Sequence, residues 1–256
     1  MEERTVSDLA YLAGRWPLDS KKPTLVFIHG AGASSRFWVN QIDALEARAN
    51  TVALDRPGHG RSPRPGCDSI PAYTRRVVEF VEMLHAPRPI LAGLSMGGAI
   101  VLQALLDCPG RFEAAILMNT GAKLKVLPAI FDLLQSDFPG YVDLTGTFGV
   151  SPKTPRENYD AVLKDTAAQS PEVTHGDFRA CDGFDVRSRL SEIKAPVLVI
   201  SAEDDRLTPP AYGEFLAKGI PGARRVHIAE AGHLALVEKP DEVNRAILEF
   251  LSRNGL

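Results

Sequence analysis

Six short apolar runs recur along the 256-residue chain, with helical patterns between them. Most of these runs are too continuous for a strand with one exposed face and too short for a helix. Such runs are typical of parallel strands that are buried on both faces of a sheet. The runs are TLVFI (24–28), TVALD (51–55), PILAG (89–93), AAILM (114–118), PVLVI (196–200) and RVHIA (225–229). We therefore expect an α/β fold with a mostly parallel sheet flanked by helices.

Four helical patterns accompany the runs. GGAIVLQALLD (97–107) is apolar nearly all round, which predicts a buried helix. PDEVNRAILEFL (240–251) opens with a proline and two acids and has one apolar face, as expected of a helix that covers a sheet. The other two are FWVNQIDALEARA (37–49) and IPAYTRRVVEFVEML (70–84). Near the N-terminus, RTVSDLAYLAGRWP (4–17) predicts an antiparallel pair of strands at one edge, giving an eight-stranded sheet.

The alternation of runs and helices stops between about residues 121 and 189. This stretch holds helical fragments such as PAIFDLLQSDF (128–138) and ENYDAVLKDTAAQ (157–169), and no strong strand pattern. We expect a mainly helical cap insertion at 121–189, placed over one end of the sheet. The core would then comprise residues 1–120 and 190–256.

Composition and charge argue against several classes of partner. With 45% hydrophobic residues, 24% charged residues and a net charge of −3, the chain shows no electrostatic footprint for nucleic acid or an anionic membrane. No apolar stretch approaches the roughly 18 residues of a membrane span, and the acidic N-terminus is unlike a signal peptide. Cys67, Cys108 and Cys181 form no C-x-x-C pair and suit a reducing compartment. We expect a cytoplasmic monomer or homodimer without a metal or other cofactor.

The segment GLSMGG (93–98) follows an apolar run and opens the buried helix. This is the G-x-S-x-G pattern in the context of a strand, a sharp turn and a helix, which strains the serine backbone and projects its hydroxyl clear of the sheet. Side chains at Gly93 and Gly97 would clash with neighbouring chain in such a turn. Ser95 is therefore the candidate nucleophile, placed at a helix N-terminus that favours developing negative charge.

A serine hydroxyl needs a base to take its proton. Among the six histidines, only His233 lies in a loop that leaves a strand end, after a glycine and before a helix. It is the candidate base, whereas His59, His85 and His227 are interpreted as solvated or core residues. The loop SAEDDRLTPP (201–210) offers an acid to orient the imidazole, from Glu203, Asp204 and Asp205.

An oxyanion hole requires two aimed N–H groups. One would come from Met96, the residue after the nucleophile, and the other from Ala31 in the small-residue loop HGAGASS (29–35). We expect His29 to have a structural role, in which its imidazole holds the loop that carries Ala31.

The motifs FIHGAG, DRPGHGRS, GLSMGG, SAEDDRLTPP and EAGHLALVEKP occur in this order, and with them the chain resembles the α/β-hydrolase fold superfamily. It is most similar to small bacterial carboxylesterases and enol-lactonases, over nearly the whole chain except the cap. The resemblance implies the triad Ser95, Asp205 and His233. Asp205 is preferred because members commonly carry G-x-x-D-x-x-x-P, and Asp205 keeps the spacing to Pro209. Ala202 replaces the glycine of that pattern, so Asp204 remains the alternative.

These residues imply a serine hydrolase that cleaves small-molecule carboxylic esters through an acyl-enzyme on Ser95. The same machinery serves lactone opening, C–C bond hydrolysis and perhydrolysis, and a receptor-like binding protein with little turnover is a further alternative. The turn GAGASS (30–35) also mimics a dinucleotide-binding turn, but its third small position is Ser35 rather than glycine or alanine.

The cap residues are open to two interpretations. Apolar side chains could line an acyl pocket, although packing of the cap on itself and on the core is expected for most of them. They are Phe131, Leu133, Leu134, Phe138 and Tyr141. Arg179, Asp182 and Asp185 suggest either a salt-bridged hinge where the cap rejoins the sheet or, for the arginine, a contact with a substrate carboxylate.

Overall fold

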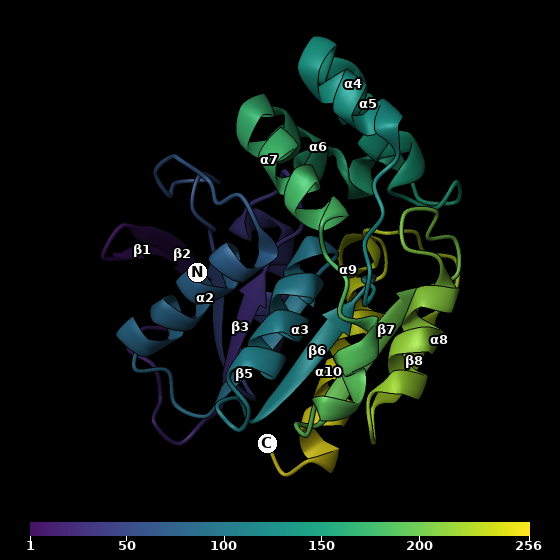
Figure 1. The fold of residues 1–256 in the computed structure, drawn as a ribbon. Helices are drawn as coiled ribbons and strands as arrows, with labels where there is room; N and C mark the ends of the chain where they lie inside the picture. The colour runs from purple at the N-terminus through teal and green to yellow at the C-terminus, as the bar shows by residue number, and fades with distance from the viewer.

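Eight strands form one sheet in the order β1-β2-β4-β3-β5-β6-β7-β8, in a computed structural model that describes residues 1–256 (Figure 1). The strands are β1 (Glu2–Val6), β2 (Leu9–Ala13), β3 (Thr24–Ile28), β4 (Asn50–Leu54), β5 (Pro89–Leu94), β6 (Ala114–Met118), β7 (Val197–Ala202) and β8 (Arg224–Ile228). β1 pairs with β2 and β2 with β4 in antiparallel fashion, and every other pair is parallel. The expected mostly parallel α/β sheet of eight strands is confirmed.

The six apolar runs correspond to β3 through β8, and the N-terminal hairpin forms β1 and β2. β8 departs from the expectation of strands buried on both faces, because only its last residue, Ile228, is buried. Its position at the edge of the sheet leaves the other side chains partly or fully exposed, His227 among them.

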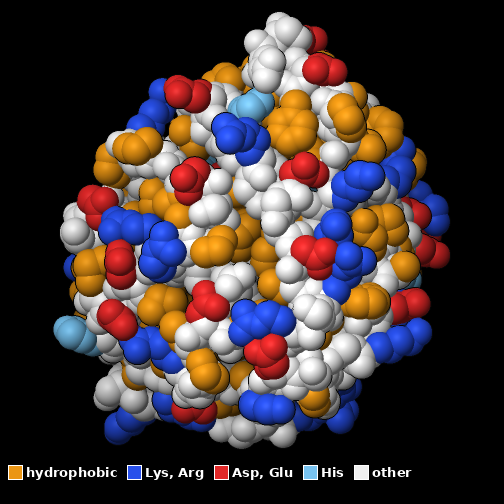
Figure 2. All heavy atoms as spheres, viewed as in Figure 1, with side chains coloured by type: hydrophobic (Ala, Val, Ile, Leu, Met, Phe, Trp, Pro, Cys, Tyr) orange, Lys and Arg blue, Asp and Glu red, His pale blue; other side chains and the backbone are white.

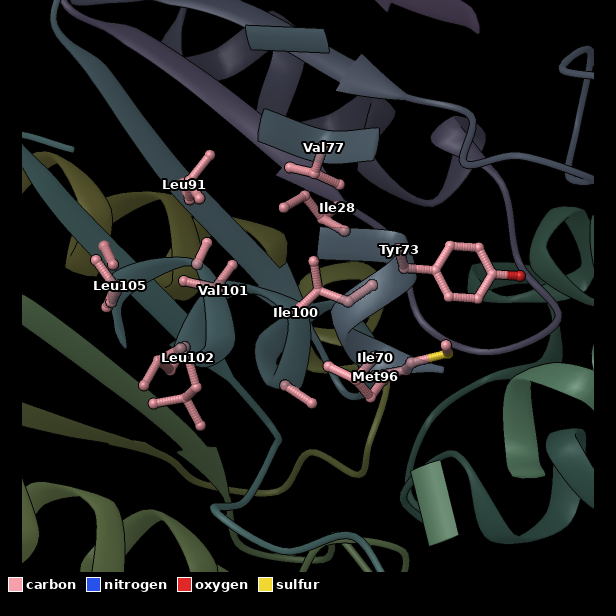
Figure 3. Close-up of a cluster of buried hydrophobic side chains, with 14 of the residues drawn as sticks. Ile28, Ile70, Tyr73, Val77, Leu91, Met96, Ile100, Val101, Leu102 and Leu105 are labelled. Carbon is pink, nitrogen blue, oxygen red and sulfur yellow. The ribbon is translucent and has the colours of Figure 1, made fainter. Parts of the chain in front are cut away.

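Helices cover both faces of the sheet. One face carries α2 (Ile70–Met83), α3 (Met96–Asp107) and α8 (Pro210–Gly219), and the other carries α1 (Val39–Leu45), α9 (Ala235–Glu238) and α10 (Pro240–Arg253). Each layer closes over its own apolar cluster, and Figure 3 shows Ile100 and Val77 facing Ile28 in the first of these. The helix expected over 37–49 is shorter and follows a 3-10 turn, η1 (Ser35–Trp38). The helix α8 was not predicted from the sequence.

The segment between β6 and β7 contains helices and no strand. Its helices are α4 (Pro128–Ser136), α5 (Phe138–Phe148), η2 (Arg156–Asn158), α6 (Asp160–Ala167), α7 (Pro171–Asp182) and η3 (Arg187–Glu192), the last at the return to β7. The helices α4 to α7 lie beyond the strand ends, at the top of Figure 1. The two ends of this cap meet in a bridge between Lys123 and Asp185 and in a 2.8 Å hydrogen bond from Val186 N–H to Ala122 O.

None of the helices is both long and apolar enough to cross a bilayer. On the face drawn in Figure 2, lysine and arginine side chains are interspersed with aspartate and glutamate. Charge of one sign does not gather over any large part of this face.

Candidate active site

Ser95 lies at the turn between β5 and α3, where it caps the helix N-terminus. Its backbone has φ 54° and ψ −118°, a conformation that costs a non-glycine residue about 1–3 kcal/mol. A Cβ atom at Gly93 would collide with the backbone of Gly97, and one at Gly97 would collide with Ile28 O. The two glycines therefore allow the strained turn, and Ser95 N–H is fixed to Met118 O at 3.0 Å.

His233 and Asp205 form a buried pair. The imidazole Nδ1 lies 3.0 Å from Asp205 Oδ2 and 3.1 Å from Oδ1, and the two residues are 6% and 3% exposed. Thr208 supports the carboxylate with its N–H at 2.8 Å and its hydroxyl at 2.7 Å. Burial alone would raise the pKa of Asp205, but the charge of His233 and these hydrogen bonds outweigh it and hold the pKa below its ordinary value. The carboxylate is therefore ionised at neutral pH and orients the ring.

Asp204 faces away from this pair. Its Oδ2 accepts a 2.6 Å hydrogen bond from Ser151 Oγ of the cap. Of the two adjacent acids, the structure thus places Asp205 against the imidazole, in keeping with its spacing to Pro209. Ala202, which stands in place of a glycine, is the buried last residue of β7 and does not disturb this geometry.

Two residues after β6 connect the serine turn to the histidine loop. Asn119 Nδ2 donates to Gly232 O at 3.0 Å and to His233 O at 2.8 Å. The next residue, Thr120, donates its hydroxyl to Ser95 O at 2.7 Å. Ser95 and His233 are therefore attached to the same short segment at the carboxyl ends of the parallel strands, where sheets of this type place their sites.

The expected contact between serine and histidine is not formed in this structure. Neither Ser95 Oγ nor His233 Nε2 makes a hydrogen bond within the protein, whereas the contact of the imidazole with the carboxylate is complete. The Nε2 atom of His233 thus has no hydrogen-bond partner within the protein.

The loop after β3 passes beside Ser95. A Cβ atom on Gly30 would lie 3.3 Å from Ser95 Cβ, a tight contact, so a glycine lets the backbone come this close without displacing the serine. The next N–H, that of Ala31, has no hydrogen-bond partner within the protein. Met96 is the first residue of α3, where N–H groups lack a partner within the helix.

A buried ionic cluster under this loop was missed by the sequence analysis. Arg56 and Asp177 are both 0% exposed, and Arg56 Nη2 lies 2.9 Å from Asp177 Oδ2. His59 Nε2 lies 2.8 Å from the same carboxylate oxygen, so His59 is a core residue with an ionic partner. His29 Nδ1 lies 2.9 Å from Gly30 O, which confirms its expected structural role. The position of Arg56 two residues after β4 was the only signal in the sequence.

Glu238 is a second buried carboxylate that the sequence did not reveal. Its Oε1 accepts from Gly232 N–H at 2.9 Å, next to His233. Its Oε2 accepts from the cap, at 2.7 Å from Ser151 N and 2.6 Å from Thr154 Oγ1. The Glu238 carboxylate therefore connects the loop that carries His233 to the segment that follows α5.

The aromatic and aliphatic cap residues pack mainly against other side chains. Leu134 and Tyr141 are buried, and Phe131, Leu133 and Phe138 pack partly buried against the same core. This is the packing arrangement that the sequence favoured.

The second cap prediction holds for only some of its residues. Asp185 pairs with Lys123 at 3.3 Å, and Asp182 accepts from Val126 N–H at 3.1 Å. Arg179 makes no ion pair and lines a surface cleft of about 220 Å³, whose lining includes neither Ser95 nor His233. No group of three histidine, cysteine, aspartate or glutamate side chains is arranged to hold a metal ion.

Comparison with known proteins places this architecture in one family. The chain matches the alpha/beta hydrolase family over residues 25–246. It is 31% identical to an Azorhizobium caulinodans protein that carries the name carbamate hydrolase RutD, over 86% of this chain and 88% of that protein. Among solved structures, the enol-lactonase from Burkholderia xenovorans LB400 has a TM-score of 0.88 and 25% identity, covering 98% of this chain and 100% of that one. A thermophilic esterase has a TM-score of 0.85 and 31% identity, covering 96% and 94%. The chain therefore belongs to the alpha/beta hydrolase family.

Proposed function

We propose that this hydrolase cleaves carboxylic esters of small molecules through an acyl-enzyme on Ser95. The observation that carries the proposal is the buried pair of Asp205 and His233, whose Nε2 has no protein partner, attached through Asn119 and Thr120 to the strained serine turn. A nucleophile, a base and an acid that orients the base are the three parts that acyl transfer by serine requires.

The proposed steps follow from the position of each group. His233 Nε2 takes the proton of Ser95 Oγ, and Oγ attacks the ester carbonyl carbon. The N–H groups of Ala31 and Met96 stabilise the oxyanion of the tetrahedral intermediate. His233 then protonates the leaving alcohol and activates the water that releases the acid, while Asp205 fixes the tautomer of the imidazole.

The proposal is tested with Ser95→Ala and p-nitrophenyl esters. Because the hydroxyl is the attacking group, we expect kcat to fall by at least about 10³-fold. Ser191→Ala, which alters an exposed serine, is the matched control and should keep full activity. Retained turnover by a folded Ser95→Ala variant would overturn the mechanism. Tight ligand binding by the wild-type chain without any turnover would instead support the receptor-like alternative.

The bond that is cleaved is tested with a substrate panel. The names of the relatives include carbamate hydrolase, enol-lactonase and esterase, and all three reactions begin with attack at a carbonyl carbon. We expect p-nitrophenyl esters of short and medium acids to give higher kcat/KM values than lactones or carbamates of similar size. A higher kcat/KM for a lactone or a carbamate would move the assignment to that class.

A further inference from the structure

The Arg56–Asp177 pair is unusual because both charges are completely removed from solvent. Arg56 follows β4 in the core, and Asp177 lies on α7 of the cap. Two hydrogen bonds join them, at 2.9 Å from Nη2 to Oδ2 and 3.3 Å from Nη1 to Oδ1. Burying an ion pair costs free energy that its mutual attraction often only just recovers, so such a pair is weak evidence of a stabilising role. Its other contacts indicate what it does.

Those contacts surround one peptide group. Arg56 Nη2 also donates to Gly30 O at 2.9 Å. The backbone N–H of Arg56 donates to His29 Nε2 at 3.1 Å, so the ring proton is on Nδ1 and is donated to the same Gly30 O at 2.9 Å. On the far side, Asp177 Oδ2 accepts from Gly32 N–H at 3.1 Å. The Gly30–Ala31 peptide is thus held at its carbonyl and at the residue that follows it.

The carbonyl of Gly30 and the N–H of Ala31 belong to the same amide. Resonance couples the two ends, so a cation on the oxygen draws electron density from the nitrogen and makes its N–H a stronger donor. Hydrogen bonds in which one partner is charged are roughly twice as strong as neutral ones. The arginine therefore acts, through this amide, on an N–H group in the loop that passes beside Ser95.

We propose that Arg56, oriented by Asp177, is a positioning residue that strengthens the Ala31 N–H as an oxyanion donor through the Gly30–Ala31 peptide. The inference rests on the proposed function. Arg56 itself is 0% exposed and cannot contact substrate. Other charged or titratable groups against the cluster are His59, at 2.8 Å from Asp177, and Tyr73, whose ring lies 4.5 Å below the guanidinium.

The test compares Arg56→Gln, the double variant Arg56→Gln with Asp177→Asn, and Arg56→Lys. The double variant removes both charges of the Arg56–Asp177 pair and keeps an acceptor for Gly32 N–H. Because the oxyanion is absent from bound substrate and develops only on the way to the tetrahedral intermediate, we expect Arg56→Gln and the double variant to lower kcat about tenfold with KM within twofold. Inhibition by phenylboronic acid, whose tetrahedral adduct with Ser95 places an oxygen in the oxyanion position, should weaken by a similar factor. Arg56→Lys keeps the charge and should stay within about threefold of wild type.

Arg61→Gln is the matched control, since Arg61 lies in the same loop but bonds Tyr11 O and not Gly30. A folded double variant with wild-type kcat, or a loss confined to KM, overturns the inference. If both glutamine variants fail to fold, His29→Leu and His29→Asn provide the test, because His29 Nδ1 is the other side-chain donor to Gly30 O. Asparagine keeps a donor near this carbonyl oxygen, and leucine does not. Leucine should then lower kcat several-fold more than asparagine, and equal values overturn the inference. Ester turnover retained in Ser95→Ala would instead mean that the proposed function itself is wrong.

Discussion

Asp204 and Asp205 are adjacent carboxylates with unrelated surroundings. Asp205 accepts hydrogen bonds from Thr208 and faces His233, whereas the carboxylate of Asp204 accepts only from the hydroxyl of Ser151. The sequence alone left both open, and only spacing to Pro209 in a resembling family favoured Asp205. The two aspartates differ in the direction in which the loop backbone points each side chain, and the residue type, which is the same in both, does not reveal that direction.

The two acids therefore provide a matched pair of isosteric substitutions. We expect Asp205→Asn to lower kcat by about 10³- to 10⁴-fold, because the amide would hold the imidazole in the wrong tautomer. Asp204→Asn should change kcat by less than about threefold, since it loses only one hydrogen bond away from the ring. Steady-state kinetics on a p-nitrophenyl ester measure both, with circular dichroism to check folding. Equal losses in the two variants would contradict the assignment of Asp205.

Thr208 gives a finer test at the same scale. Its hydroxyl donates to Asp205 Oδ2 at 2.7 Å and also lies 3.2 Å from His233 Nδ1. We expect Thr208→Val to lower kcat about tenfold with little change in KM, and Thr208→Ser to restore most of it. A valine variant with wild-type kcat would show that the backbone N–H groups suffice to fix the carboxylate.

At the scale of elements, the histidine loop is held by the helix that follows it. Glu238, the last residue of α9, accepts hydrogen bonds from the loop and from the cap and forms no salt bridge. We expect Glu238→Gln to lower the free energy of unfolding by about 2 kcal/mol, because the amide group would face at least one buried N–H. It should also reduce kcat, since Gly232 precedes His233. Urea denaturation and ester kinetics measure the two effects, with Glu249→Gln, an exposed position on α10, as the control.

The sequence predicted helices and strands well where the spacing of apolar residues determines them, and poorly where contacts with distant segments determine them. Apolar runs located all six later strands, because β3 to β7 are buried on both faces and need continuous apolar residues, and the run at β8 was apolar enough to be recognised although this edge strand is mostly exposed. The α8 helix was missed because it follows a proline-rich acid loop and buries only Gly213 and Leu216. In the site, Ser95, His233, Ala31 and Met96 could be nominated from local context, whereas the choice of Asp205 over Asp204 needed the resemblance to a known family. Arg56, Asp177 and Glu238 could not, because their partners lie in segments distant along the chain and a charged residue shows no burial pattern.

At the scale of the whole molecule, buried titratable groups make stability depend on pH. Burial, helped by the charge of Arg56, lowers the pKa of His29 well below its usual value, so His29 is neutral in the folded protein. In the unfolded chain a histidine titrates near pH 6.5. Below that pH the unfolded state binds a proton that the folded state does not, so the free energy of unfolding falls by up to about 1.4 kcal/mol per pH unit.

Urea denaturation at pH 7.5, 6.5 and 5.5 tests this dependence. The pKa values of Asp177 and Asp205 are lowered because Arg56 and His233, respectively, outweigh the effect of burial, so their contributions are complete above about pH 4 and are lost only as the pH falls further. The decline between pH 6.5 and 5.5 should therefore be smaller in His29→Asn and unchanged in His227→Asn, which alters an exposed histidine of β8. Identical slopes in wild type and His29→Asn would rule out His29 as the cause.

Asp177 of α7 contacts the loop after β3, and this contact limits which parts of the chain can be exchanged with another hydrolase. In a chimera, residues 121–189 would be replaced by the equivalent region of another hydrolase. The guanidinium of Arg56 would then be buried without its counter-ion, unless the new region has an acidic residue at position 177. Residues 121–189 and the loop after β3 therefore cannot be exchanged independently of each other. A design that replaces this region must transfer both members of the Arg56–Asp177 pair, or neither.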